Sequence, residues 1–320
     1  MSDTVVRAFT FPGQGSQAVG MGKDLADAFP QAKAAFDEVD EALGQKLTQI
    51  MWDGPAEDLT LTMNTQPALM AVSVAVIRVL QAEAGLDLAK HAKFVAGHSL
   101  GEYSALCAAG SIDLATTARL LRLRGEAMQR AVPVGKGAMA ATLGLANDKV
   151  GEAVDVAAKE TGEPVSVAND NADGQVVISG SKAGVERACE LAKEAGAKRA
   201  MQLTVSAPFH SSLMQPAADE MAVALADVTI AAPAVPLIAN VRAEAISDPE
   251  TIRALLVEQI TGRVRWRESV IFMRDQGVSE LVECGAGKVL TGLTKWIDRS
   301  ITGKTINSAD AVREIAASGF

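Results

Sequence analysis

The sequence is poor in cysteine. Cys107, Cys189 and Cys284 are the only three among 320 residues, and they lie far apart and are odd in number. A disulfide framework needs paired cysteines and a structural zinc site needs clustered ones, so this scarcity argues against both. It is typical of a protein that works in a reducing compartment, and we expect a cytoplasmic location.

The chain also lacks the segments that mark export or membrane insertion. The longest apolar run covers residues 68–77 and is ended by Arg78, so it is too short to cross a bilayer. The N-terminal residues show no signal-peptide pattern and lead directly into a strand-like run at residues 5–11. We therefore expect no membrane partner.

An excess of positive charge is absent as well. The chain has 30 Lys and Arg against 39 Asp and Glu, a net charge of −9, which argues against a nucleic-acid partner. Its 48% hydrophobic and 22% charged residues are an ordinary globular balance. A chain of 320 residues is long enough for one large domain or two unequal ones, each with a core.

Two nucleotide-binding motifs are missing, Gly-x-x-x-x-Gly-Lys-Ser/Thr and Gly-x-Gly-x-x-Gly. The first strand-like run ends instead in Phe-Pro-Gly-Gln-Gly-Ser-Gln at residues 11–17. A loop at the carboxyl end of a strand in an open α/β sheet lies where ligands bind. The backbone N–H of Gln14 is therefore a candidate hydrogen-bond donor to a site at this edge.

The most informative stretch joins a strand-like run at residues 94–96 to a helical run at residues 103–109. Between them stands Gly-His-Ser-Leu-Gly, with the serine at position 99. Strand, Gly-x-Ser-x-Gly and helix together predict a nucleophile elbow, in which a Cβ at either glycine would clash. This turn would expose the hydroxyl of Ser99 and leave the backbone N–H of Leu100 free to bind an oxyanion. The alternative is an ordinary serine in a tight turn.

A serine nucleophile needs a base, and the sequence offers only three histidines. His91 lies in a polar loop, and His98 is the neighbour of Ser99, so its side chain should point away from the hydroxyl. His210 follows a strand-like run and a proline-fixed turn, which places it at the ligand-binding edge. We predict His210 as the base, with a surface histidine as the alternative, and no carboxylate partner can be chosen for it.

Two arginines are candidates for binding an anionic substrate group. Asp113 is a predicted N-cap for a helix that runs to about residue 131, and its apolar stripe is flanked by Arg122 and Arg124. Each lies about 80° from the stripe, on opposite sides. Helical geometry therefore leaves open which of them faces a site, and a solvated face is the usual position of such residues.

The domain organisation follows from a change of pattern near residues 133–137, which are rich in Gly and Pro. The next seventy residues or so alternate as β-α-β-β-α-β, the order of a ferredoxin-like module. We predict an α/β fold, with a large hydrolase-like catalytic domain at 1–132 and 206–320. Its mostly parallel sheet would be flanked by helices, and a ferredoxin-like α+β subdomain would be inserted at 133–205.

Five segments occur in a characteristic order along nearly the whole chain: residues 11–17, 97–102, 123–125, 207–210 and 285–290. In sequence and in spacing they resemble the malonyl-CoA:acyl carrier protein transacylases, an acyltransferase family of fatty-acid and polyketide synthesis. The resemblance implies a hydrolase-like α/β domain with a ferredoxin-like insert, as the patterns above predict.

The resemblance also implies roles for particular residues. Ser99 would be the nucleophile and His210 the general acid and base, with the backbone N–H groups of Gln14 and Leu100 as the oxyanion hole. Arg124, rather than its neighbour two residues earlier, would bind the malonyl carboxylate.

Two further roles are implied around the base. The backbone carbonyl of Gln259 would orient His210 in place of a carboxylate, and Phe209 resembles the version associated with malonyl rather than methylmalonyl selection. Malonyl-CoA would be the substrate, a phosphopantetheinylated acyl carrier protein the partner, and no cofactor or metal is implied.

The expected reaction is a ping-pong transfer through a malonyl ester on Ser99. Two other enzymes remain possible on the same elbow, a serine thioesterase or esterase and an acyltransferase for another acyl-CoA. A carrier-binding protein without activity is a third alternative, and an intact Ser99, His210 and Arg124 argue against it.

Overall fold

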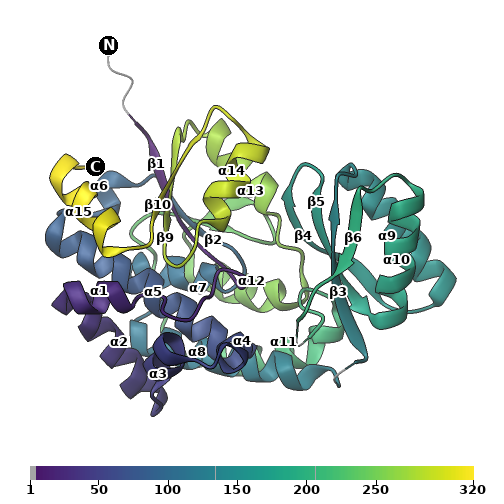
Figure 1. The fold of residues 1–320 in the computed structure, drawn as a ribbon, viewed down its shortest axis with the longest axis horizontal. Coiled ribbons are helices and arrows are strands. Elements are labelled where there is room, and N and C mark those ends of the chain that lie inside the picture. Colours follow the sequence, from purple (N-terminus) through teal and green to yellow (C-terminus); the bar gives the residue numbers. More distant parts are fainter. Residues whose placement is uncertain (1–4, 134, 206) are drawn as a thin grey trace.

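The computed structural model describes residues 5–133, 135–205 and 207–320 (Figure 1). Two separate sheets organise it, a six-stranded sheet in the order β10-β9-β1-β2-β7-β8 and a four-stranded sheet in the order β4-β5-β3-β6. Figure 1 shows helices around the larger sheet and the smaller sheet at the other end of the molecule, covered by α9 and α10.

The six-stranded sheet is parallel except for β8, which pairs antiparallel with β7. This confirms the predicted mostly parallel sheet flanked by helices. Strands β8 and β10 were not predicted, because both are short edge strands without a buried apolar run. The strands are β1 (Arg7–Phe11), β2 (Phe94–Gly97), β7 (Leu237–Ala239), β8 (Glu244–Ile246), β9 (Glu280–Cys284) and β10 (Thr302–Ile306).

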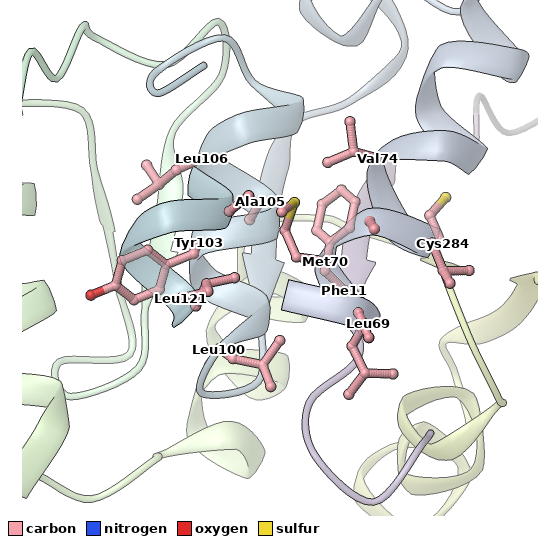
Figure 2. Packing of buried hydrophobic residues seen from close by; sticks show 14 of the residues in the cluster. Phe11, Leu69, Met70, Val74, Leu100, Tyr103, Ala105, Leu106, Leu121 and Cys284 are labelled. Carbon is pink, nitrogen blue, oxygen red and sulfur yellow. The ribbon is translucent and has the colours of Figure 1, made fainter. Parts of the chain in front are cut away.

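The six-stranded sheet and the helices around it form the larger part of the molecule. Helix α5 lies at its centre and packs against α2, α7 and α8. The apolar run at residues 68–77, which alone is too short to cross a membrane, belongs to this longer helix, which is long and apolar enough to do so. However, 89% of its most apolar stretch is buried inside the protein. Figure 2 shows part of this core, in which Leu69 and Met70 of α5 pack near Phe11 and Leu100. The elbow therefore rests on a rigid apolar layer.

The helices around the larger sheet include several short ones, and α3, α4, α6 and α15 were not predicted. Their bounds are α1 (Lys23–Ala28), α2 (Pro30–Leu43), α3 (Leu47–Asp53), α4 (Ala56–Thr60), α5 (Thr62–Glu83), α6 (Leu88–His91), α7 (Gly101–Ala108), α8 (Leu114–Ala131), a 3₁₀ turn (Ser212–Met214), α11 (Gln215–Ala226), α12 (Pro249–Thr261), α13 (Trp266–Asp275), α14 (Val289–Ile297) and α15 (Ala309–Ser318).

The four-stranded sheet has the predicted β-α-β-β-α-β order and is antiparallel throughout. Val134 and Ser206, beside the predicted boundaries of the insert, lie outside the described residues, and those boundaries stay a prediction. The elements are β3 (Gly137–Leu143), α9 (Asn147–Thr161), β4 (Val165–Ala172), β5 (Gln175–Ser181), α10 (Lys182–Glu194) and β6 (Arg199–Gln202).

The smaller sheet is joined at β4 to the segment between α12 and α13. The backbone N–H of Val264 donates to the carbonyl of Ala168 at 2.8 Å, and that of Asp170 donates to the carbonyl of Val264 at 2.9 Å. Beside this bridge, Arg267 Nε and a terminal nitrogen donate to the two carboxylate oxygens of Asp170 at 2.9 and 2.8 Å. These contacts fix the smaller sheet over the carboxyl ends of the parallel strands.

Candidate active site

Ser99 lies in the turn between β2 and α7, and its backbone is in the left-handed region with φ 53°. A Cβ on Gly97 would lie 1.9 Å from the carbonyl carbon of Gly101, and one on Gly101 would lie 2.3 Å from the carbonyl oxygen of Phe11. Only glycine fits at either position. The elbow has the strand-turn-helix geometry that the sequence predicted.

The hydroxyl of Ser99 lies beside His210. Their Oγ and Nε2 atoms are 2.8 Å apart, although 111 residues separate them in the sequence. The other ring nitrogen, Nδ1, is 2.8 Å from the carbonyl oxygen of Gln259 and 3.1 Å from that of Gly262. Carbonyl oxygens only accept, so Nδ1 carries the hydrogen and Nε2 is left to accept a proton from Ser99.

His210 is only 4% exposed. Burial, followed by the nearby positive charge of Arg124, lowers the pKa of His210 to about 3. The imidazole is therefore neutral at ordinary pH and available as a base. The predicted contact with the carbonyl of Gln259 is present, while the second carbonyl, that of Gly262, was not predicted.

Arg124 and Arg122 have different surroundings, which the helix pattern could not show. Arg124 is 2% exposed, and one of its terminal nitrogens lies 3.2 Å from the hydroxyl of Ser99. Arg122 is half-buried and donates instead to the amide oxygen of Asn64 at 2.8 Å. Of the two, Arg124 is the one placed beside the nucleophile.

Arg124 is held beside the serine by neutral groups. Its terminal nitrogens donate to the amide oxygens of Gln66 and Gln259, both at 2.7 Å, and to the hydroxyl of Ser99. Within the described part of the chain, its Nε has no hydrogen-bond partner. A buried guanidinium held by neutral groups can bind a carboxylate brought by a ligand.

Gln14 and Leu100, the predicted oxyanion-hole residues, both line the same pocket as Ser99. Leu100 is the residue before α7, at the helix end where backbone N–H groups are unpaired. The side-chain oxygen of Gln14 accepts from the hydroxyl of Thr62 at 3.1 Å, which anchors the loop after β1. The roles of their backbone N–H groups stay predictions.

This pocket has a volume of about 160 Å³ and lies between the two sheets, with walls from both. The larger part supplies the reacting groups and the smaller part mainly apolar and amide side chains. The lining residues are Gln14, Gln66, His98, Ser99, Leu100, Arg124, Met128, Met139, Asn169, Asn171, Val177, Leu203, Val205, Phe209 and His210.

Neither of the other two histidines faces the serine hydroxyl, but His91, which was predicted in a polar loop, is the last residue of α6. His98 turns away from the serine hydroxyl, and its Nε2 is 2.8 Å from the amide oxygen of Asn171. His91 lies outside the pocket, and its Nδ1 accepts from the backbone N–H of Asp87 at 3.0 Å. Phe209, predicted beside the base, is part of the pocket wall.

Asn240, which the sequence analysis did not single out, holds the elbow in place. Its amide oxygen accepts from the backbone N–H of Ser99 at 2.7 Å, and its amide nitrogen donates to the carbonyl of Gly97 at 2.6 Å. It follows β7, the parallel neighbour of β2. A polar residue directly after a buried strand is the signal that could have indicated it.

Gln66 and Glu102 were missed as well. Gln66 lies in the largely apolar α5, where a buried amide is unusual, and it holds Arg124. Glu102 directly follows the elbow and is only 1% exposed. Its carboxylate accepts from the backbone N–H of Asn240 at 3.2 Å and from the side-chain amide of Gln259.

The geometry combines a serine hydroxyl, a neutral imidazole and a buried guanidinium held by neutral groups. Among the described residues, no group of three or more His, Cys, Asp or Glu could hold a metal ion. The arrangement suits transfer of an acyl group through a serine ester, with a preference for acyl groups that carry an anionic end.

The comparisons with known proteins agree on one family. A family model described as an acyl transferase domain matches residues 8–295. A malonyl CoA-acyl carrier protein transacylase of Escherichia coli O157:H7 is 50% identical over 305 residues, covering 95% of this chain and 97% of the relative. One from Bacillus subtilis strain 168 is 48% identical over 303 residues, covering 95% and 93%.

Solved structures match over almost the full length. An acyl-carrier-protein-S-malonyltransferase from Bartonella henselae has a TM-score of 0.95 at 55% identity, covering 98% of this chain and 99% of that one. A malonyl-transacylase in complex with its type II PKS acyl-carrier protein has a TM-score of 0.94 at 45% identity, covering 98% and 100%.

Proposed function

We propose that this chain, which belongs to the acyl transferase domain family, transfers a malonyl group from malonyl-CoA to the phosphopantetheine thiol of acyl carrier protein. The names of relatives at about half sequence identity support this substrate and this acceptor. The structural neighbour bound to an acyl-carrier protein supports the partner.

In the first half-reaction, His210 Nε2 takes the proton of the Ser99 hydroxyl as Oγ attacks the thioester carbonyl. The negative charge on the former carbonyl oxygen would be bound by the backbone N–H groups of Gln14 and Leu100. When the C–S bond breaks, His210 returns the proton to the leaving CoA thiolate. The product is CoA and a malonyl ester on Ser99.

The second half-reaction runs the same steps in the opposite sense. His210 takes the proton of the carrier's phosphopantetheine thiol, and the thiolate attacks the ester carbonyl. The C–O bond to Ser99 breaks, and the serine oxygen receives the proton from His210. Malonyl carrier protein and free enzyme are the products, which gives ping-pong kinetics.

One observation carries the choice of a malonyl group. Arg124 is buried, lines the pocket, and has a terminal nitrogen 3.2 Å from the serine hydroxyl, while amide oxygens hold the guanidinium in place. A planar guanidinium can bind both oxygens of a carboxylate at once. An acyl group that carries a free carboxylate would satisfy both the serine and the arginine, and the names of the relatives support malonyl among such groups.

The test is the intact mass of the protein after mixing with malonyl-CoA. The mass should rise by one malonyl group with release of CoA, and addition of carrier protein should move the group to the carrier. Ser99→Ala should show no adduct, whereas the control Ser104→Ala should behave like the unmodified protein. Ser104 suits as a control because its hydroxyl is buried on α7 without a partner in the described chain.

Two results would contradict the proposal. A malonyl adduct of normal yield on the Ser99→Ala protein would place the nucleophile elsewhere. Loss of the malonyl group to water at the same rate with and without carrier protein would indicate a thioesterase.

The reaction also has expected requirements for metal, cofactor and cellular location. It uses no metal and no cofactor besides the CoA thioester, so excess EDTA should leave the rate of transfer unchanged. We also place the protein in the cytoplasm, a proposal that the free thiols of Cys107, Cys189 and Cys284 support.

A further inference from the structure

Glu102 is a buried carboxylate that the mechanism above does not use. It lies in the first turn of α7, three residues after the nucleophile, and both of its oxygens accept hydrogen bonds. One oxygen accepts from the backbone N–H of Asn240 and the other from the side-chain amide of Gln259. Neither donor is charged, so the carboxylate is buried without a direct ion pair. Burying a charge in this way costs free energy.

Gln259 connects this carboxylate to Arg124. Its amide oxygen accepts from a terminal nitrogen of Arg124 at 2.7 Å, and its amide nitrogen donates to Glu102 and, at 3.0 Å, to the carbonyl of Ser99. A guanidinium can only donate, so the amide oxygen of Gln259 must face Arg124. The amide nitrogen then faces Glu102, which must accept.

We propose that Glu102 is a positioning residue: through the side chain of Gln259 it holds Arg124 in the orientation that binds a substrate carboxylate, and so sets the preference for malonyl over neutral acyl groups. This rests on the proposed function, because it assigns the carboxylate to the malonyl group. Glu102 does not touch the substrate, and its negative charge is the counter-charge of Arg124 across one amide.

The arrangement favours the ionised carboxylate, because a protonated Glu102 accepts more weakly from the two N–H donors and supplies no counter-charge for Arg124. Burial raises the pKa of Glu102 to about 7, against the two hydrogen bonds and the positive charge of Arg124, which lower it. The other titratable groups around it stay neutral near that pH. Burial raises the pKa of Tyr103 to about 12, and burial and Arg124 lower that of His210 to about 3.

The direction of the pH dependence follows from the charge of Glu102. Above the pKa of Glu102 the carboxylate is ionised and Gln259 holds Arg124, and below it the network is weakened. The ratio of kcat/KM for malonyl-CoA to that for acetyl-CoA should therefore fall as the pH decreases from 8 to 6. The phosphates of CoA titrate alike in both substrates, so their contribution cancels in the ratio.

The variant for the test is Glu102→Gln. Its amide oxygen can still accept from the backbone N–H of Asn240, but its NH₂ group would face the NH₂ group of Gln259. The control is Glu283→Gln, because Glu283 is equally buried and accepts from the backbone N–H groups of Leu290 and Thr291 at the start of α14. That carboxylate lies outside the pocket.

The measurement is the rate of CoA release on acylation with malonyl-CoA and acetyl-CoA between pH 6 and 8.5. Glu102→Gln should lower the malonyl-to-acetyl ratio at pH 8 by roughly 5- to 150-fold, the effect of leaving a buried donor unpaired. The ratio should also lose its pH dependence. Glu283→Gln should leave the ratio and its pH dependence unchanged.

Three results would overturn the inference: an equal loss for both substrates, an unchanged ratio in Glu102→Gln, or a ratio in the unmodified protein that rises as the pH falls. The last needs no variant, so the inference is tested even if Glu102→Gln does not fold. Failure of the proposed function would look different, because the unmodified protein would then form no malonyl adduct at any pH.

Discussion

Arg124 and Arg122 stand two positions apart on α8, but only the first lies beside the nucleophile. Arg124→Ala should reduce kcat/KM for malonyl-CoA by a factor of roughly 30 to several thousand, because a buried substrate carboxylate without its partner costs about 2–5 kcal/mol. Acetyl-CoA has no carboxylate and should be transferred at least as well as before. Arg124→Lys should recover part of the malonyl activity, since a point charge replaces a planar fork.

The control for this change is Arg122→Ala, measured with the same two substrates. Arg122 donates to Asn64 outside the pocket, so both rates should stay close to those of the unmodified protein. A selective loss of malonyl transfer in Arg122→Ala would reverse the assignment, and an equal loss of both substrates in Arg124→Ala would make that residue structural.

His210 should act as a base over an unusually wide pH range. Burial and the charge of Arg124 lower its pKa to about 3, so the imidazole stays neutral as the pH falls through 6.5, where a solvated histidine would be protonated. Transfer from acetyl-CoA does not use the hydrogen bonds that link Glu102, Gln259 and Arg124. For this substrate, kcat/KM should therefore show no fall between pH 8 and 5. A drop centred near 6.5 would contradict the buried, neutral base.

The role of His210 as the base can also be tested by removing its imidazole. His210→Ala should slow both half-reactions by roughly 10²- to 10⁴-fold, the usual contribution of general acid–base catalysis. His91→Ala is the control, because His91 lies outside the pocket and should have almost no effect. Similar rates for the two variants would show that the base lies elsewhere.

The residues that carry the chemistry could be predicted better than those that hold them. Ser99 and His210 followed from a local motif and from elimination among three histidines. Arg124 could be separated from its neighbour only by family resemblance, since both flank the same stripe. Asn240 lies 141 residues from Ser99, its hydrogen-bond partner, and no local pattern connects them.

At the scale of elements, the elbow depends on two glycines that no other residue can replace. Gly97→Ala would place a Cβ 1.9 Å from the backbone of Gly101, so either α7 or β2 must move. The free energy of unfolding should fall by more than about 3 kcal/mol, beyond the usual range for overpacking, and acylation should be lost. Thermal denaturation and the intact-mass assay measure the two effects.

A second glycine provides the control. Gly292 lies on the exposed face of α14, and a Cβ there would meet nothing within 4 Å. Gly292→Ala should leave activity unchanged and stabilise the protein by up to about 1 kcal/mol, the difference in helix propensity. If Gly97→Ala and Gly292→Ala change the stability by similar amounts, small backbone movements must relieve the clash at the elbow at little cost in free energy.

Most elements with a buried apolar run or stripe were predicted, but the ten-residue helix α15 was missed along with several shorter elements. The helix that begins after Asp113 was expected from its cap, and the aspartate side chain does accept from the backbone N–H of Thr116 at 2.8 Å. Residues 17–29 also have a helical pattern, but α1 begins only at Lys23. Gly20 and Gly22 have φ values of 95° and 75°, which form turns there instead.

At the scale of the whole molecule, the ion pair between Asp170 and Arg267 holds the smaller sheet over the site. Asp170→Ala would remove the closest acceptor of Arg267 and of Asn147, leaving them the longer contacts with the carboxylate of Asp173 at 3.6 Å and the carbonyl of Ala172 at 3.2 Å. The free energy of unfolding should fall by about 1–3 kcal/mol. KM for malonyl-CoA should rise, because Asn169 and Asn171 beside Asp170 line the pocket.

The control is an exposed ion pair in the same sheet-and-helix unit, Lys149 with Glu152. Glu152→Ala should change stability by less than about 1 kcal/mol, as is usual for solvated pairs, and leave KM unchanged. Thermal denaturation and initial rates would be measured for both variants. If Asp170→Ala lowers stability without raising KM, the ion pair does not shape the pocket.

The order of strands has a consequence for how the chain is made. In the larger sheet, β1 and β2 are paired with each other, and their outer neighbours are β9 and β7. Both neighbours leave the ribosome only after all of the smaller sheet has been synthesised. Until then the nascent chain has two apolar strands with open edges, which are prone to pair with other chains. A chaperone that binds extended apolar segments would find its substrate in that interval, before the serine and its histidine have met.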